Sequence, residues 1–120
     1  MDELLREGIR RFNNREFFYC HEVLEEAWTP ERGPRRSFLQ ALIHIAVGFY
    51  HDQRGNSAGA RGQLGKGLRK LAVYLPEYDG IDTERLYRET LAVLERVDAG
   101  NSGVAEYPQI LVSGKEPQFS

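Results

Sequence analysis

The sequence has a single cysteine, Cys20, and no long hydrophobic run. One cysteine cannot form an internal disulfide, and it excludes a cysteine-rich metal module. No apolar stretch approaches the roughly 18 residues that a membrane-spanning helix requires. The first residues, Met1, Asp2 and Glu3, lack the basic and apolar regions of a signal peptide. These absences predict a cytoplasmic protein that does not bind membranes.

An excess of positive charge is also missing. The formal net charge is −2 and the isoelectric point is about 5.9. The chain as a whole therefore has no attraction for phosphate backbones, and nucleic acid is not an expected partner. A glycine-rich phosphate loop is absent as well, because residues 62–67 have the wrong order of side chains for one. Nothing in the sequence supports nucleotide binding.

The composition that remains is typical of a globular domain. Of the 120 residues, 41% are hydrophobic and 28% are charged, which are ordinary proportions for a chain that folds on its own. The length fits one hydrophobic core and leaves little room for a second. We therefore expect one helical domain over residues 1–100, with a C-terminal tail over residues 101–120 packed against it.

Apolar residues recur at intervals of three and four, and the runs are interrupted at Asn13-Asn14, Pro30, Gly55 and Pro76. This spacing predicts an all-α bundle of about five helices. They fall at residues 2–12, 15–28, 37–54 and 57–75, with a fifth from residue 82 or 83 to about 97. Asn13 or Asn14 is expected to cap the second helix, Ser37 the third, and Asp82 or Thr83 the fifth.

The expected fourth helix is rich in glycine, with Gly59, Gly62, Gly65 and Gly67. Each costs about 0.8–1.0 kcal/mol relative to alanine in a helix interior. Close approach of a neighbouring helix or a ligand would offset that cost, because glycine lacks the side chain that keeps two backbones apart. A frayed, irregular helix is the alternative.

The second helix turns a histidine toward its apolar side. At about 100° per residue, the apolar arc consists of Phe17, Cys20, Leu24, Ala27 and Trp28. His21 falls inside this arc, and Glu25 lies directly above it one turn later. A buried imidazole needs a hydrogen-bond partner, so His21 predicts a contact with Glu25 or with a metal ion. Glu22 points away from the arc toward solvent.

The third helix is apolar nearly all round, which places it at the centre of the bundle. Its polar stripe consists of Gln40, His44 and His51. The stripe either faces solvent or forms a site, and it lacks the Lys, Glu and Arg that usually mark a solvent face. Two imidazoles opposite His21 and Glu25 would suit Zn²⁺, Mn²⁺ or Fe²⁺. Such a site would be assembled across helices, because the local sequence has neither the zinc-protease nor the di-iron spacing.

Two other features have weaker chemical meaning. Cys20 and His21 are neighbours on a helix and point about 100° apart, so they cannot pair as nucleophile and base; Cys20 is expected in the core. Arg32, Arg35 and Arg36 gather before the third helix. They form a solvated loop or a receptor for a carboxylate or phosphate.

The order and spacing of several short segments resemble a known family. These segments are Phe12-Asn13, Phe17-Phe18, His21-Glu22-Val23-Leu24-Glu25, Trp28, Phe38-Leu39-Gln40-Ala41-Leu42-Ile43, His51, Gly55-Asn56 and Gly59-Ala60. Together they resemble the small helical proteins grouped as domain-of-unknown-function family 309, over about residues 12–82. The resemblance implies an all-helical fold and, since related proteins are in places described as predicted metal-dependent hydrolases, a site at His21, Glu22, Glu25 and His51 with Gln40 nearby. His44 departs from the family pattern, in which glutamine is expected.

Two functions follow from these patterns. In the first, His21, Glu25 and His51 bind a divalent metal, and Gln40, His44 and Trp28 line a pocket for a small molecule. The metal activates water for hydrolysis, with Glu25 or Glu22 as general base. In the second, the chain is a non-catalytic interaction or structural module, with a homodimer through the glycine-lined fourth helix as one form. The same residues are then a buried hydrogen-bond network.

Overall fold

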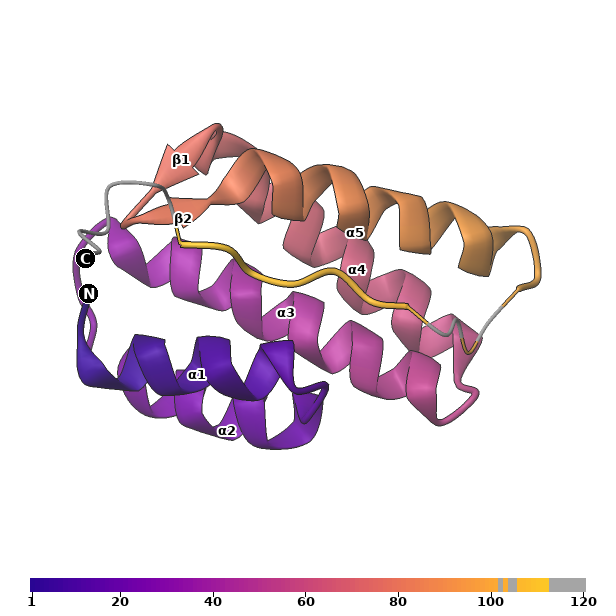
Figure 1. Cartoon of the computed structure of the whole chain (residues 1–120), viewed down its shortest axis with the longest axis horizontal. Coiled ribbons are helices and arrows are strands. Elements are labelled where there is room, and N and C mark those ends of the chain that lie inside the picture. The colour runs from indigo at the N-terminus through magenta and orange to yellow at the C-terminus, as the bar shows by residue number, and fades with distance from the viewer. Residues whose placement is uncertain (102, 104–105, 113–120) are drawn as a thin grey trace, which may run out of the picture.

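The computed structural model describes residues 1–101, 103 and 106–112, and in this part of the chain five α-helices form a bundle (Figure 1). The helices are α1 (Glu3–Asn13), α2 (Phe17–Trp28), α3 (Arg35–Gln53), α4 (Ser57–Leu71) and α5 (Thr83–Asp98). A short 3₁₀ helix, η1 (Ala72–Tyr74), and an antiparallel hairpin of β1 (Glu77–Tyr78) and β2 (Ile81–Asp82) connect α4 to α5. The predicted all-α fold is confirmed.

Each of the first four helices packs against the next one along the chain, and α3 contacts both α2 and α4. Figure 1 shows the pair α1 and α2 on one side of α3 and the pair α4 and α5 on the other. This central position agrees with the apolar residues around most of the circumference of α3. No helix in the described residues is long and apolar enough to cross a membrane.

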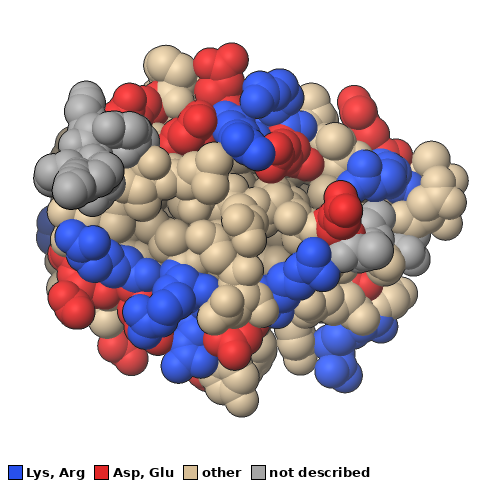
Figure 2. Space-filling view, in the orientation of Figure 1, with Lys and Arg blue, Asp and Glu red and all other residues tan. Residues whose placement is uncertain are grey.

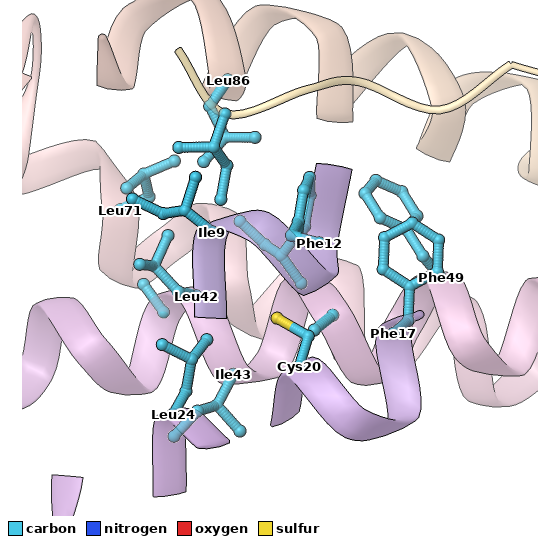
Figure 3. Close-up of a cluster of buried hydrophobic side chains, with 14 of the residues drawn as sticks. Ile9, Phe12, Phe17, Cys20, Leu24, Leu42, Ile43, Phe49, Leu71 and Leu86 are labelled. Atoms are coloured by element: carbon cyan, nitrogen blue, oxygen red, sulfur yellow. The ribbon is translucent and has the colours of Figure 1, made fainter. Parts of the chain in front are cut away.

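The core contains aromatic rings at one end and aliphatic side chains along the helices (Figure 3). The rings of Phe12, Phe17 and Phe49 pack with centroid separations of 5.1 to 5.9 Å, within the range that favours edge-on and tilted aromatic pairs. Cys20 is fully buried beside them, as predicted, and burial raises the pKa of its thiol to about 12. The thiolate is therefore not available as a nucleophile near neutral pH.

Close approach of α3 and α4 accounts for two of the four glycines of α4. A Cβ at Gly67 would lie 2.7 Å from Ile45 Cγ1 and 3.1 Å from the carbonyl oxygen of Ala41. A Cβ at Gly59 would lie 2.9 Å from the ring of His51. Gly62, in contrast, has no such atom within 4 Å. The prediction of a close neighbouring helix is confirmed at Gly59 and Gly67.

Two of the predicted helix caps are wrong. Glu16, not Asn13 or Asn14, occupies the N-cap of α2, and its side chain makes no capping hydrogen bond. Ser37 lies inside α3, which begins two residues earlier, after Pro34. The expected cap of α5 is confirmed, because Asp82 Oδ1 accepts a hydrogen bond from the backbone N–H of Arg85 at 3.0 Å.

The region after α4 differs from the prediction. The α-helix ends at Leu71, short of residue 75, and η1 follows it. Between the fourth and fifth predicted helices, residues 77–82 form the β1–β2 hairpin, which the spacing of apolar residues did not predict. Two-residue strands are too short to produce a recognisable alternation of apolar and polar side chains.

The described part of the C-terminal tail packs on the bundle. Residues 106–112 run in extended form across α3, between α1 and α5 (Figure 1). Ile110 is 2% exposed, and the backbone N–H of Asp82 donates to the carbonyl oxygen of Leu111 at 2.9 Å. On this face uncharged side chains form a band across the middle, bordered by charged ones (Figure 2). Residues 102, 104–105 and 113–120 of the predicted tail lie outside the described residues.

Candidate functional site

His21 lies on α2, and its two ring nitrogens have different environments. Nδ1 lies 2.7 Å from the carbonyl oxygen of Phe18. Because a carbonyl only accepts, Nδ1 carries the proton and donates. Nε2 lies 3.8 Å from Glu25 Oε2, and the side chain of His21 is 21% exposed. His21 and Glu25 thus approach each other on adjacent turns as predicted, but the hydrogen bond of the imidazole goes to the carbonyl oxygen of Phe18 and not to Glu25.

The two histidines of α3 contact the neighbouring helix and its cap. His44 Nδ1 lies 2.8 Å from Gln63 Oε1 on α4, so it donates a hydrogen bond that links α3 to α4. His51 Nδ1 lies 3.4 Å from the side-chain nitrogen Nδ2 of Asn56, the N-cap residue of α4. Gln40 is half-buried on α3, four residues before His44. The polar stripe of α3 thus borders α4.

The predicted metal ligands do not all meet at one point. His21 and Glu25 come together, whereas His51 is engaged at the start of α4. Within the described residues, no group of three or more His, Cys, Asp or Glu side chains is placed to hold a metal ion. Three protein ligands are the usual set for a catalytic zinc ion. Metal binding by His21, Glu25 and His51 stays a prediction.

The carboxylates assigned to general-base chemistry lie on the outside of α2. Glu22 and Glu25 are exposed and, with Glu26 and Thr29, line an open depression on the surface. An exposed carboxylate keeps its hydration shell, whereas a catalytic site excludes water from around its reacting groups. Of the two, only Glu25 approaches a histidine.

Trp28 and Arg36, the second residue of α3, form a separate cluster at the C-terminal end of α2. The guanidinium carbon of Arg36 lies 3.8 Å from the ring centroid of Trp28, in cation–π geometry. Arg36 also donates to the carbonyl oxygens of Trp28 and Glu31, at 2.9 and 2.8 Å. The arginine therefore fixes the end of α2 to the start of α3, and Trp28 stands apart from the histidines.

Arg35 binds carboxylates of its own chain. Its guanidinium pairs with Asp2, with Glu31 at 3.3 Å and with Asp79 at 2.9 Å. Burial alone would raise the pKa of Asp2, but the N–H of Leu5 and the charge of Arg35 hold that pKa below its usual value. Of the two expectations for the basic residues, Arg35 at the start of α3 thus fits a receptor for carboxylates, and these carboxylates belong to the same chain.

A row of rings connects the two helices that carry His21 and His51, and it was not predicted from the sequence. The ring of Phe18 lies 5.2 Å from that of His21 and 5.4 Å from that of Tyr50. The ring of Tyr50 in turn lies 6.1 Å from that of His51. Phe18 is 40% exposed and Tyr19, beside it, is 57% exposed. A signal existed, because Phe18 and Tyr19 both fall outside the apolar arc of α2.

Comparison with known proteins assigns the chain to a family. Residues 5–63 match the family described as domain of unknown function DUF309. The chain is 32% identical over 108 residues to the uncharacterized protein YpuF of Bacillus subtilis (strain 168), in an alignment that covers 88% of the chain and 60% of YpuF. The chain belongs to the DUF309 family. The resemblance seen in the sequence is confirmed.

The DUF309 match contains the whole predicted site. It extends from α1 into α4, and every histidine of the chain and the acidic residues of α2 lie within it. The chain is also 24% identical over 106 residues to an uncharacterized protein of Aquifex aeolicus (strain VF5), covering 88% of the chain and 32% of that protein. It thus spans 60% of the length of YpuF and 32% of the Aquifex protein.

Proposed function

We propose that this DUF309 chain is a non-catalytic helical interaction module. The row of rings formed by His21, Phe18, Tyr50 and His51 carries this proposal. It gives the module a partly exposed aromatic surface, built from two helices that the bundle holds rigidly. Exposed aromatic side chains on a rigid support are characteristic of protein interaction sites.

The contacts of the imidazoles support a structural role in this module. His21 donates to a carbonyl of its own helix, and His44 links α3 to α4 through Gln63. A half-buried histidine with such a partner is stabilising, and removal of the partner leaves a polar group without its hydrogen bond. His44 thereby holds α3, which carries Tyr50 and His51, in register with α4.

Metal-dependent hydrolysis is the second candidate, and one observation favours it. Histidine ligands usually donate their other ring N–H to a carbonyl or carboxylate, which orients the free nitrogen toward the metal. His21 has this arrangement, since Nδ1 donates to Phe18 and Nε2 faces Glu25. The pair would supply two ligands, and a third donor from outside the pair would be needed for a zinc, manganese or iron site.

Elemental analysis of untagged protein separates the two functions. For an interaction module we expect less than about 0.1 equivalent of zinc, manganese or iron after incubation with each ion and removal of the excess. His21→Ala is the diagnostic variant, and His44→Ala is its control because His44 bonds to Gln63 away from Glu25. Near-stoichiometric metal that is lost in His21→Ala and kept in His44→Ala would overturn the proposal.

The structural role has its own measurement. A double-mutant cycle on His44→Ala and Gln63→Ala, followed by urea denaturation, should give a coupling free energy of about 0.5–1.5 kcal/mol, the usual net contribution of one hydrogen bond. Additive effects of the two substitutions would contradict a linking role for His44.

A further inference from the structure

The charged side chains of α4 are all positive. The helix has no acidic residue, and its four cations are Arg61, Lys66, Arg69 and Lys70. Among the described residues a salt bridge reaches only Arg61, from Asp98 at 3.9 Å. The other three cations lie within about 100° of one another around the helix axis. In a chain with a net charge of −2, α4 is thus a local concentration of positive charge that attracts an acidic partner.

Two glycines of α4 lie beside these charges without a contact from another helix. Gly62 is exposed, one turn before Lys66, and a Cβ there would meet nothing within 4 Å. A Cβ at Gly65 would meet only Arg69 of the same helix, at 3.5 Å from Nη1. The floor between the cations is therefore bare backbone, which a bulky side chain of a partner can reach. We call Gly62, Lys66, Arg69 and Lys70 the basic face of α4.

The outer side of α2 has the opposite charge. We define the acidic face of α2 by four exposed residues, Phe18, Glu22, Glu25 and Glu26. Its three carboxylates border one open depression, and no Lys or Arg of the described residues pairs with them; Glu25 approaches only His21. Glu22 and Glu26 are four residues apart, and like charges at this spacing destabilise a helix by a few tenths of a kcal/mol. Cations from outside the chain would relieve this repulsion.

The two faces match in spacing as well as in charge. The cations of the basic face repeat the spacing of the carboxylates of the acidic face, at positions i, i+3 and i+4. Gly62 and Phe18 each lie four residues before the first charged residue of their face. With the two helices parallel, every carboxylate is therefore level with a cation, and the exposed Phe18 ring is level with the bare backbone at Gly62. In the opposite direction, the ring and the glycine would lie at opposite ends of the contact.

We propose that the basic face of α4 binds the acidic face of α2 in a second copy of this chain, with the two helices parallel. Within one copy α2 and α4 lie on opposite sides of α3 (Figure 1), so the two faces of one copy cannot meet. A symmetric α2–α2 or α4–α4 contact would oppose like charges. The contact is therefore head to tail, and it repeats from copy to copy into a ring or a chain. This inference names the partner of the proposed interaction module and rests on that function.

The dimensions of the faces set the expected strength of association. Helix α2 has 12 residues and is therefore about 18 Å long. A contact of that length buries less than the roughly 800 Å² per partner of a standard interface. Association should accordingly be weak, with a dissociation constant in the micromolar range, and it should weaken as salt rises because its charges are exposed.

Sedimentation equilibrium of the full chain tests this inference. We expect the average mass to rise with protein concentration, and to rise less in about 500 mM than in about 50 mM NaCl. Lys66→Glu places like charges opposite one another and should raise the dissociation constant about tenfold. Arg88→Glu is the matched control, because Arg88 is exposed on α5 and the substitution changes the net charge equally. It should leave association unchanged.

Mixing of variants tests the head-to-tail arrangement. Glu22→Lys should weaken association as Lys66→Glu does, because each variant loses one of its two faces. A mixture of the two variants should associate again, since the unaltered acidic face of one meets the unaltered basic face of the other. A symmetric contact between two α2 helices would instead be insensitive to Lys66→Glu. Circular dichroism of each variant confirms that it is folded.

Gly62→Thr tests the parallel register without changing charge. Its Cβ lies in open space, so the fold should hold. A β-branched side chain is stiff in a helix and cannot turn aside, so it should keep the Phe18 ring of the second copy away from the backbone of α4. We expect the dissociation constant to rise about tenfold, as on loss of a central aromatic contact.

Three results would overturn the inference: a monomer at all concentrations, association that Lys66→Glu or Glu22→Lys leaves intact, or Gly62→Thr associating as the wild type does. All are distinguishable from failure of the proposed function. That function fails on stoichiometric metal bound through His21, which is measured on the same samples and does not depend on the oligomeric state.

Discussion

The side chain of Asp52 has an unusual position for an acidic residue. It is fully buried near the C-terminal end of α3, where the helix dipole disfavours a negative charge. Tyr107 donates its phenolic O–H to Asp52 Oδ2 at 2.7 Å, and the backbone N–H of Gly103 donates to Oδ1 at 2.8 Å. These bonds offset the cost of burial, and they connect the C-terminal segment to the core at a single residue.

Ionisation of Tyr107 should weaken the folded state at high pH. Burial, and next the hydrogen bond to Asp52, raise the pKa of Tyr107 above its usual value of 10. The folded protein therefore holds this proton more tightly than the unfolded chain, so the stabilisation is complete below about pH 10 and is lost as pH rises further. We expect the free energy of unfolding, from urea denaturation between pH 8 and 11, to fall more steeply in the wild type than in Tyr107→Phe.

The ultraviolet absorbance of ionised tyrosine provides the control for this prediction. One of the six tyrosines of the folded chain should titrate well above pH 10, and this step should be missing in Tyr107→Phe. Equal pH dependence of the two proteins would contradict the assignment of the shift to Tyr107.

The glycines of α4 differ in what a methyl group would meet, and this gives opposite predictions for two positions of one helix. Gly62→Ala adds a Cβ in open space and should raise the free energy of unfolding by about 0.8–1.0 kcal/mol, from helix propensity. Gly67→Ala forces a Cβ against backbone atoms of α3, which cannot rotate away. Overpacking costs about 1–3 kcal/mol, so after the gain in propensity a net loss of up to about 2 kcal/mol is expected.

Urea denaturation of both variants measures the difference directly, and each serves as the other's control. A stabilising Gly67→Ala would mean that α3 and α4 are not in close contact at this position. Equal changes in the free energy of unfolding at the two positions would mean that helix propensity alone determines the effect of each substitution.

The existence and approximate extent of the helices were predictable because periodicity reports which face of a helix is buried. The caps were less predictable, because a residue that local sequence rules assign as a helix cap can bind a distant segment instead. Asn13 binds the backbone of Ile110, 97 residues away, instead of capping α2. A contact between segments so distant in sequence leaves no local signal.

The candidate site shows the same limit. The approach of His21 to Glu25 was predictable, because both lie on one helix and are four residues apart. The partners of His44 and His51 were not, because they belong to α4 and its cap. Angular positions on α3 identify a polar stripe, but they do not say which neighbouring helix borders it. The exposure of the Phe18 ring could be predicted, because Phe18 falls outside the apolar arc of α2.

At the scale of the whole molecule, the C-terminal segment closes the space between the two halves of the bundle. Residues 106–112 run between α1 and α5 (Figure 1). Tyr107 packs its ring against Phe17 and Phe49, at 5.3 and 5.1 Å. Val112 forms an isolated bridge with Ile81 of β2. The segment thus contacts residues from both halves, which are far apart along the chain.

Asn13 should also contribute to this closure. Its side-chain amide donates to the carbonyl oxygen of Ile110 at 3.0 Å and accepts from the Ile110 N–H at 2.7 Å. Asn13→Ala removes both bonds and should lower the free energy of unfolding by about 1–3 kcal/mol, at 0.5–1.5 kcal/mol per hydrogen bond. The Ile110 amide should also exchange with deuterium faster, as local opening of the segment becomes easier. Asn14→Ala is the matched control, because Asn14 is exposed next to it. Unchanged exchange at Ile110 in Asn13→Ala would mean that burial of the Ile110 and Tyr107 side chains suffices to hold the segment.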